Sequence, residues 1–139
     1  MNYANWGTRA GACIIDALVT VPLILLALLD RPVVDATTNE TSGGGVLYWG
    51  LTVAAFVLNG YNRWYLAGKT GQSWGKRVLG TSLVGAATQQ PIGALKAFLR
   101  DLAHIIDTII CYIGWLFPIW DAKRQTIADK IVSTVVVKS

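Results

Sequence analysis

The feature that most constrains the fold is an apolar run at residues 10–29, whose only charged residue is Asp16. Eleven residues of this run are Leu, Ile or Val. Each favours membrane insertion by about 0.3 to 0.6 kcal/mol, and together they outweigh the roughly 2.5 to 3.5 kcal/mol cost of one mid-helix aspartate. A run of this length spans the hydrocarbon core. We therefore expect a retained membrane helix, because a cleaved signal peptide has a shorter apolar region.

The composition of the chain also indicates a membrane protein. Of its 139 residues, 53% are hydrophobic and 14% are charged, whereas soluble domains carry about 25% charged residues. The length favours a single domain, residues 1–139. The formal net charge is +4, but in a membrane protein Lys and Arg mark the cytoplasmic side before they suggest nucleic acid. Cys13 and Cys111 lie in apolar runs, which is typical of small buried side chains and not of a disulfide.

A second apolar run, residues 46–67, predicts a second membrane helix antiparallel to the first. Its end carries aromatic and polar residues that are typical of the membrane interface. Residues 30–45, between the two runs, are polar and Gly-rich and predict a flexible outer loop. Residues 68–100 are basic, so we expect this segment and the N-terminus to lie in the cytoplasm.

The third apolar run, residues 105–120, allows two arrangements. It is short for a full crossing, which takes roughly 20 residues, and one crossing would place the basic C-terminal tail outside. We favour a re-entrant helical hairpin and keep a third plain span as the alternative. Residues 77–84 and 133–137 are rich in β-branched and apolar residues and predict a small cytoplasmic sheet. The expected fold is an all-α membrane protein with an antiparallel transmembrane helix pair, this third element and the small sheet.

Two segments, residues 9–16 and 100–107, share the pattern R-x-x-A-x-I-I-D. Duplication and chance explain the match equally well. Arg9 and Asp16 lie on one helix face about 10 Å apart, which is too far for a direct bond. Arg9 is long enough to reach the head groups, but Asp16 is not. Because an isolated carboxylate in hydrocarbon is prohibitively costly, Asp16 must find a partner from another segment or be protonated.

The depth of Asp16 along its helix predicts this partner. Asn59 lies at a similar height on the antiparallel helix, and Arg63 lies one turn lower with a longer side chain. We expect Asp16 to face Asn59 and Arg63, with the segment 100–107 as a competing partner. The other polar residues expected in the network are Asn62, Arg100 and Asp107. The network is expected chiefly to hold helices together, and the alternatives are a proton or cation relay and docking to a partner subunit.

The sequence contains no recognisable catalytic constellation, so we expect no enzymatic activity. The single histidine, His104, and the two distant cysteines lack the spacing of metal ligands, and we expect His104 to be solvated or capped. Residues 68–77, GKTGQSWGKR, suggest a phosphate-binding loop but lack its G-x-x-x-x-G-K-[ST] spacing. We therefore expect neither a metal nor a cofactor.

In the order of these motifs, the chain resembles the RDD family of small bacterial membrane proteins, named for one arginine and two aspartates. Arg9 and Asp16 match the family's arginine and its first aspartate. The stretch GQSWGKR at residues 71–77 resembles the family's Gly-rich basic segment. The tail KRQTIADK at residues 123–130 resembles its last motif, which makes Asp129 the second aspartate. The resemblance covers nearly the whole chain.

The resemblance and the charge pattern lead to the functional expectations. We expect Asp129 to bond backbone donors or a basic residue, Lys76 or Arg77. The family's function is largely unassigned, with cation/proton exchange suggested for some members. We expect a multi-pass protein of the bacterial inner membrane, serving as an accessory or assembly subunit of a larger membrane complex. Its partners would be the lipid bilayer and another protein or a second copy. The alternative is cation/proton exchange, or other small-solute transport, with Asp16 carrying the proton.

Overall fold

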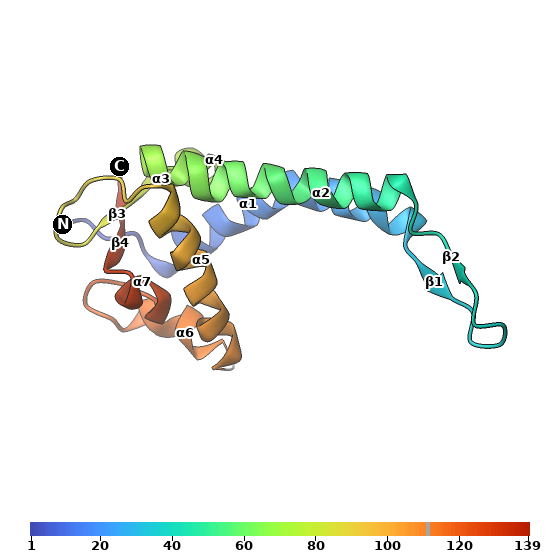
Figure 1. Ribbon diagram of the computed structural model, residues 1–139. Helices are drawn as coiled ribbons and strands as arrows, with labels where there is room; N and C mark the ends of the chain where they lie inside the picture. Colours follow the sequence, from blue (N-terminus) through green and yellow to red (C-terminus); the bar gives the residue numbers. More distant parts are fainter. Residues whose placement is uncertain (111) are drawn as a thin grey trace.

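The computed structural model describes residues 1–110 and 112–139, and most of these residues are helical. Two long helices project side by side from a smaller head, which holds the remaining helices, a two-stranded sheet and both chain termini (Figure 1). Cys111 lies outside the described residues, and so does its predicted burial. The predicted all-helical character therefore holds for most of the chain.

The first long helix, α1 (Trp6–Ala27), is followed by the 3-10 turn η1 (Leu28–Asp30). Asn5 caps α1 at its start, where the Asn5 side chain accepts a hydrogen bond from the Thr8 backbone N–H at 2.7 Å. In the described part of the chain, Trp6–Asp30 is the one unbroken helix that is long and apolar enough to cross a membrane. The apolar run predicted at residues 10–29 therefore forms the expected helix.

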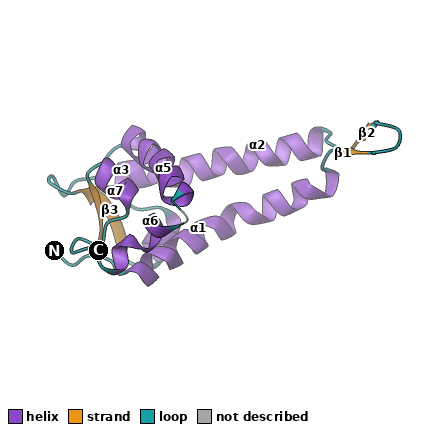
Figure 2. Ribbon diagram, turned by 90° about the horizontal axis from the view of Figure 1, so that it is seen from below, coloured by secondary structure: helices purple, strands orange, loops and turns teal. Residues whose placement is uncertain are grey.

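The second long helix, α2 (Val46–Gly60), packs along α1. It continues directly into a π-helical turn, η2 (Tyr61–Leu66), and then into α3 (Ala67–Thr70). The helical segment thus ends three residues later than the predicted boundary at residue 67. Because one short connection joins their far ends, α1 and α2 run antiparallel (Figures 1 and 2).

The connection between α1 and α2, where the sequence predicted a loop, contains a short hairpin. Strand β1 (Val33–Val34) pairs antiparallel with β2 (Thr41–Ser42). The Asp35 side chain accepts hydrogen bonds from the backbone N–H groups of Thr37 and Thr38, at 2.7 and 3.2 Å. An aspartate in this position stabilises a turn, which explains the ordered tip.

The head contains the predicted small sheet, in which β3 (Thr81–Gly85) pairs antiparallel with β4 (Thr134–Lys138). The first strand starts four residues later than predicted because a short helix, α4 (Trp74–Val78), takes up the beginning of residues 77–84. The N-terminal segment joins the free edge of β4, where the Ala4 N–H donates to the Val136 carbonyl at 2.9 Å. The sheet therefore ties both chain ends to the head.

Two helical pieces and a tail helix complete the head. Helix α5 (Ala94–Ile109) is followed by α6 (Ile113–Leu116), the 3-10 turn η3 (Phe117–Ile119) and α7 (Ile127–Ile131). The axes of α5 and the α6–η3 piece meet at 111°. The third apolar run, residues 105–120, is therefore bent, which is compatible both with the predicted re-entrant hairpin and with a broken third span.

Candidate functional site: a buried Arg/Asp cluster and its cavity

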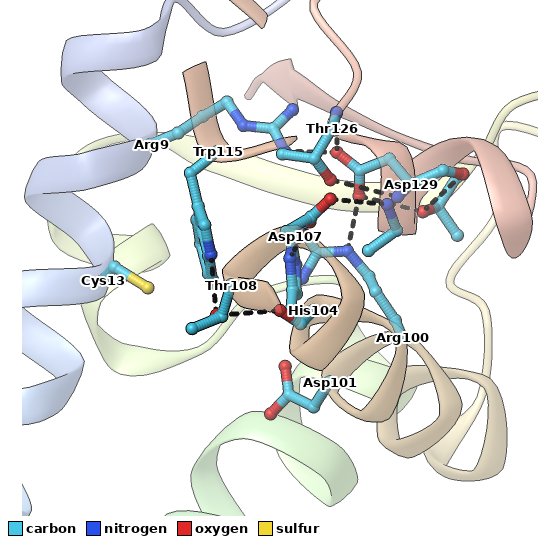
Figure 3. Close-up of polar contacts among 12 residues, drawn as sticks. Arg9, Cys13, Arg100, Asp101, His104, Asp107, Thr108, Trp115, Thr126 and Asp129 are labelled. Carbon is cyan, nitrogen blue, oxygen red and sulfur yellow. Dashed lines mark hydrogen bonds and ion pairs between the residues drawn. The ribbon is translucent and has the colours of Figure 1, made fainter. Parts of the chain in front are cut away.

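A buried carboxylate joins three helices of the head. Asp129 of α7 is 0% exposed. Its Oδ2 accepts a hydrogen bond from Arg9 Nη2 of α1, and its Oδ1 accepts one from Arg100 Nε of α5 at 2.6 Å (Figure 3). Arg9 and Asp129, two of the three residues predicted to match the family's motif, thus form a direct ion pair. Because Arg100 shares the same carboxylate, α1, α5 and α7 are held at one point.

Thr126, three residues before Asp129, helps to hold this carboxylate in place. Thr126 caps α7 by accepting from the Asp129 N–H at 3.1 Å, and Asp129 Oδ2 accepts from the Thr126 N–H at 3.2 Å. Burial by itself would raise the pKa of Asp129, but the charges of Arg100 and Arg9 hold that pKa well below its usual range. The carboxylate is therefore ionised at neutral pH, and the pair is charged.

The expected partners of Asp129 were right in one respect and wrong in the other. A backbone N–H does donate to it, but its cationic partners are Arg9 and Arg100 instead of Lys76 or Arg77. Arg77 is exposed at the end of α4. Arg100 starts from α5, which packs against α7, and the long Arg9 side chain reaches Asp129 from α1.

The second buried carboxylate, Asp16, is held by the segment around α4. Its Oδ1 accepts from Asn62 Nδ2 at 2.7 Å and from the Gly75 N–H at 2.8 Å. Its Oδ2 accepts from Ser73 Oγ at 2.6 Å. A side chain at Gly75 would collide with the Ala12 carbonyl group, so glycine permits this close approach of α4 to α1.

The predicted partners of Asp16, Asn59 and Arg63, are both wrong. Asn62 takes that position, while Asn59 makes no side-chain hydrogen bond within residues 1–110 and 112–139. The π-helical turn that begins at residue 61 shifts the helical phase, so depth counted along a regular α-helix selects the wrong asparagine. The competing partner, the segment 100–107, does not contact Asp16 through a side-chain hydrogen bond either.

Arg63 instead pairs with a residue that the sequence prediction missed, Asp101. Arg63 Nε and Nη2 donate to the two Asp101 oxygens at 3.0 and 2.9 Å, and Trp64 Nε1 donates to the same carboxylate at 2.9 Å. This pair joins η2 to α5. A signal for Asp101 did exist, because it follows Arg100 directly within the second R-x-x-A-x-I-I-D segment.

The remaining predicted residue, Asp107, pairs with the histidine. Its Oδ2 lies 2.6 Å from His104 Nδ1, and its Oδ1 accepts from the Ala128 N–H at 3.3 Å. His104 stacks on Trp115 with 4.3 Å between ring centroids (Figure 3). The expectation of a solvated or capped His104 is therefore wrong, because the side chain is buried and paired.

The two R-x-x-A-x-I-I-D segments carry matching bonds. Arg9 and Arg100 converge on one carboxylate. Each aspartate accepts a hydrogen bond from the second residue of a short capped helix: Asp16 from Gly75 in α4, and Asp107 from Ala128 in α7. Helices α1 and α5 therefore hold α4 and α7 through the same kind of contact.

The similarity extends to a second pair of segments, residues 73–85 and 126–138, whose equivalent positions lie 53 residues apart. Ser73 and Thr126 cap their short helices, which are followed by left-handed residues, Gly80 at φ 57° and Ser133 at φ 54°, and then by the paired strands β3 and β4. This repeated layout favours duplication over chance. At the position of Asp129, the first copy has Lys76.

A cavity of about 230 Å³ lies beside these clusters, and four cationic side chains line it: Arg9, Arg63, Lys76 and Arg100. Among the residues that the structure describes, no carboxylate lines its wall. The other lining residues include two tryptophans and several small apolar side chains: Trp6, Trp115, Ala10, Ala12, Pro118 and Val136. In the described part of the chain, no group of three or more His, Cys, Asp or Glu side chains is placed to hold a metal ion.

Comparisons with known proteins agree with these features. The chain is 38% identical over 149 residues to the proline-rich antigen of Mycobacterium leprae, covering 96% of this chain and 60% of that protein. It is 38% identical over 152 residues to a proline-rich antigen homolog of Mycobacterium tuberculosis, covering 98% of this chain and 63% of that protein. It thus spans about 60% of the length of these relatives. No solved structure matches the chain.

The family comparison covers almost the entire chain. Residues 3–133 match the RDD family, and this range includes the Arg9–Asp129 pair and Asp16. The family's association with membranes agrees with the apolar helix Trp6–Asp30. The chain therefore belongs to the RDD family.

Proposed function

We propose that this protein is an accessory subunit of a larger membrane complex, anchored by α1 and α2 as an antiparallel transmembrane hairpin. The carrying observation is the outward apolar surface of this pair. Leu18 is 61% exposed and Phe56 is 63% exposed, and many other large apolar side chains of the two helices are also exposed. Contiguous apolar surfaces of this size indicate contact with lipid or protein. Helix α2 contains no charged residue, and the charged residues of α1 are Arg9 and Asp16, both toward the head.

The charges at the two ends support one orientation. The head carries most of the cationic side chains: Lys69, Lys76, Arg77, Lys96, Lys123, Arg124, Lys130 and Lys138. The opposite end, around the β1–β2 hairpin, carries Asp30, Asp35 and Glu40 with a single Arg31. Since Lys and Arg favour the cytoplasmic side, the head faces the cytoplasm of a bacterial inner membrane. In this orientation the bent α5–α6 region is a helical hairpin at the inner membrane surface.

In this proposal the Arg/Asp network is structural. Asp129 and Asp101 each join segments far apart in the chain, and Asp16 fixes α4 against α1. A rigid head on a two-helix anchor suits a subunit that positions another protein, or a second copy, at the membrane.

A topology experiment tests the anchor. In a Cys13→Ser, Cys111→Ser background, Thr38→Cys places a thiol on the β1–β2 hairpin and Ala87→Cys places one on an exposed turn of the head. A membrane-impermeant maleimide should label the Thr38 variant in intact spheroplasts, but the Ala87 variant only after permeabilisation. Equal labelling of both variants in intact spheroplasts would contradict the two-span anchor.

A purification experiment tests the accessory role. The protein, tagged and expressed at its native level, is extracted in a mild detergent, and the particle mass is measured. We expect a complex of fixed stoichiometry that contains a second protein or a second copy. A monodisperse monomer across several mild detergents would count against an accessory subunit.

The second candidate function is cation/proton exchange through Asp16. The burial of the Asp16 carboxylate at the base of the long helices favours this function. Two observations disfavour it: Asp16 already accepts three hydrogen bonds, and the wall of the nearby cavity is cationic. In proteoliposomes containing a pH dye, exchange would appear as a response to sodium or potassium that Asp16→Asn abolishes. We expect no such response from the wild-type protein.

A further inference from the structure

The repeated layout of the head leaves one copy without its carboxylate. In the second copy, Asp129 neutralises Arg9 and Arg100. In the first copy, the equivalent position holds Lys76, which points a fourth cation toward the cavity. Lys76 forms no ion pair within the described residues. In the second copy, a carboxylate of the chain itself neutralises the arginines. The equivalent position in the first copy adds a cation to the cavity instead.

Hydrogen-bond donors of these cations remain free. Lys76 Nζ donates only to Ser73 Oγ, at 3.3 Å, although an ammonium group has three N–H donors. Arg100 uses only Nε toward Asp129, and its two terminal amino groups have no acceptor within residues 1–110 and 112–139. Arg100 is 7% exposed and lines the cavity, so its free N–H groups are available to a molecule bound there.

We propose that this cavity is a binding site for a phosphate group, held by Lys76 and the free N–H groups of Arg100, with Arg63 completing the cationic wall. A guanidinium group matches a phosphate with two parallel hydrogen bonds, and an ammonium group adds a point charge. The carboxylates of Asp129 and Asp101 lie behind their arginines and not on the wall. They keep the cations in place without filling the cavity.

The size and lining of the cavity fit a phosphate that carries an organic group. At roughly 30 Å³ for each water molecule, about 230 Å³ holds more than a bare ion. Trp6 and Trp115 give one side of the cavity an aromatic surface, and Trp6 begins the apolar helix α1. The phosphate can thus belong to a lipid head group at the membrane surface or to a soluble molecule. This binding site does not depend on the proposal that the protein is an accessory subunit.

The same geometry makes binding sensitive to pH. Burial, and then the charges of Arg100 and Arg63, lower the pKa of Lys76 to about 8, against the opposing influence of Asp16 and Cys13. Arg100, Arg63, Asp16 and Cys13 thus act on Lys76 from α5, η2 and α1, and Arg9 and His104 are further ionisable residues that line the same cavity. As the pH rises through about 8, Lys76 loses its charge, and the cavity loses affinity for an anion.

The test uses the full chain in a neutral detergent. Thermal stabilisation is measured with inorganic phosphate and with phosphatidylglycerol, and with phosphate-free diacylglycerol and chloride as controls, because a ligand of the native state raises the melting temperature. Lys76→Gln is compared with Arg77→Gln, which removes the same charge from the exposed neighbouring residue. Lys76→Arg keeps the charge but does not titrate in this pH range.

The proposal predicts a distinct pattern across these variants. Phosphate or phosphatidylglycerol stabilises the wild type, Lys76→Gln weakens that binding by about tenfold or more, and Arg77→Gln changes it by less than about twofold. Stabilisation by the lipid alone identifies a head group as the ligand, and stabilisation by both probes identifies a site open to soluble phosphates. Phosphatidylglycerol binding also falls between pH 7 and 9 in the wild type but persists in Lys76→Arg.

Two results would overturn the site. One is the absence of stabilisation by either phosphate probe. The other is an equal loss in Lys76→Gln and Arg77→Gln, which indicates general attraction to a basic surface. If Lys76→Gln fails to fold, the comparison of the wild type with Lys76→Arg across pH decides: identical pH profiles contradict the role of Lys76.

Discussion

Replacing Asp129 by Asn removes one buried charge and keeps nearly the same side-chain shape. The two arginines that remain are themselves almost buried, with side chains 10% and 9% exposed for Arg9 and Arg100. Removing one partner of a buried ion pair costs about 3–5 kcal/mol because the remaining charge is left uncompensated. Domains of this size are stable by about 5–15 kcal/mol. We therefore expect Asp129→Asn to lose about a fifth or more of the stability of the protein.

The assay is thermal and urea unfolding in a neutral detergent, followed by tryptophan fluorescence. A loss of 3–5 kcal/mol corresponds to a melting temperature lower by about 10 °C or more for a chain of this length. The matched control is Asp121→Asn, whose partner Lys130 is 45% exposed, so the loss should be about 1 kcal/mol or less. Equal losses in the two variants, or a loss below about 1 kcal/mol in Asp129→Asn, would refute the reasoning.

The pH dependence of the same variant gives a second measurement. The pKa of Asp129 is lowered in the folded protein, while in the unfolded chain it is about 3.9. The unfolded state therefore binds more protons in the acid range, and the stabilisation is complete above about pH 4 and lost as the pH falls below it. The stability difference between wild type and Asp129→Asn should shrink below about pH 4 and stay constant from pH 5 to 7.

The remaining predictions concern close packing and the other charged groups. Gly75→Ala should destabilise the protein by several kcal/mol, because the new methyl group collides with the Ala12 carbonyl; Gly50→Ala, in an open helical position, should instead stabilise it by about 0.5–1 kcal/mol. Both are measured by urea unfolding, and similar effects would contradict the contact. The lowered pKa of Lys76, about 8 against 10.5, means that the unfolded chain binds more protons between these values. Stability should therefore rise by up to about 3 kcal/mol over that window, and Lys76→Met should remove the rise. Asp16→Asn should lower the melting temperature measurably, since it replaces an acceptor of three hydrogen bonds.

The elements that were predictable from sequence are those set by local patterns. The apolar run at residues 10–29 forms a long helix because a single segment contains the whole signal. The sheet between β3 and β4 also follows from β-branched residues. The boundary errors have local causes as well: Ser73 starts a helix where a strand was expected, and the π-helical turn at η2 changes which asparagine faces α1.

The partners of the buried charges could not be predicted in the same way. Arg9 and Asp129 are separated by 120 residues, and Arg63 and Asp101 by 38. Which side chains meet across such separations depends on ångström-scale placement of packed segments, and helical periodicity does not contain this information. Residue type indicated that a buried aspartate needs a donor, but four cations lie close enough to compete.

By itself the sequence determined the long apolar helix, the residues that identify the family and the need for each buried carboxylate to be neutralised. These follow from the free energy of transferring single residues out of water, which depends on the residue and its immediate neighbours. The tertiary structure decided that Arg9 and Arg100 share Asp129, that Gly75 brings α4 against Asp16, and that Lys76 faces a cavity without a carboxylate. These depend on how distant segments pack, because electrostatic and hydrogen-bond energies change steeply over a few ångströms.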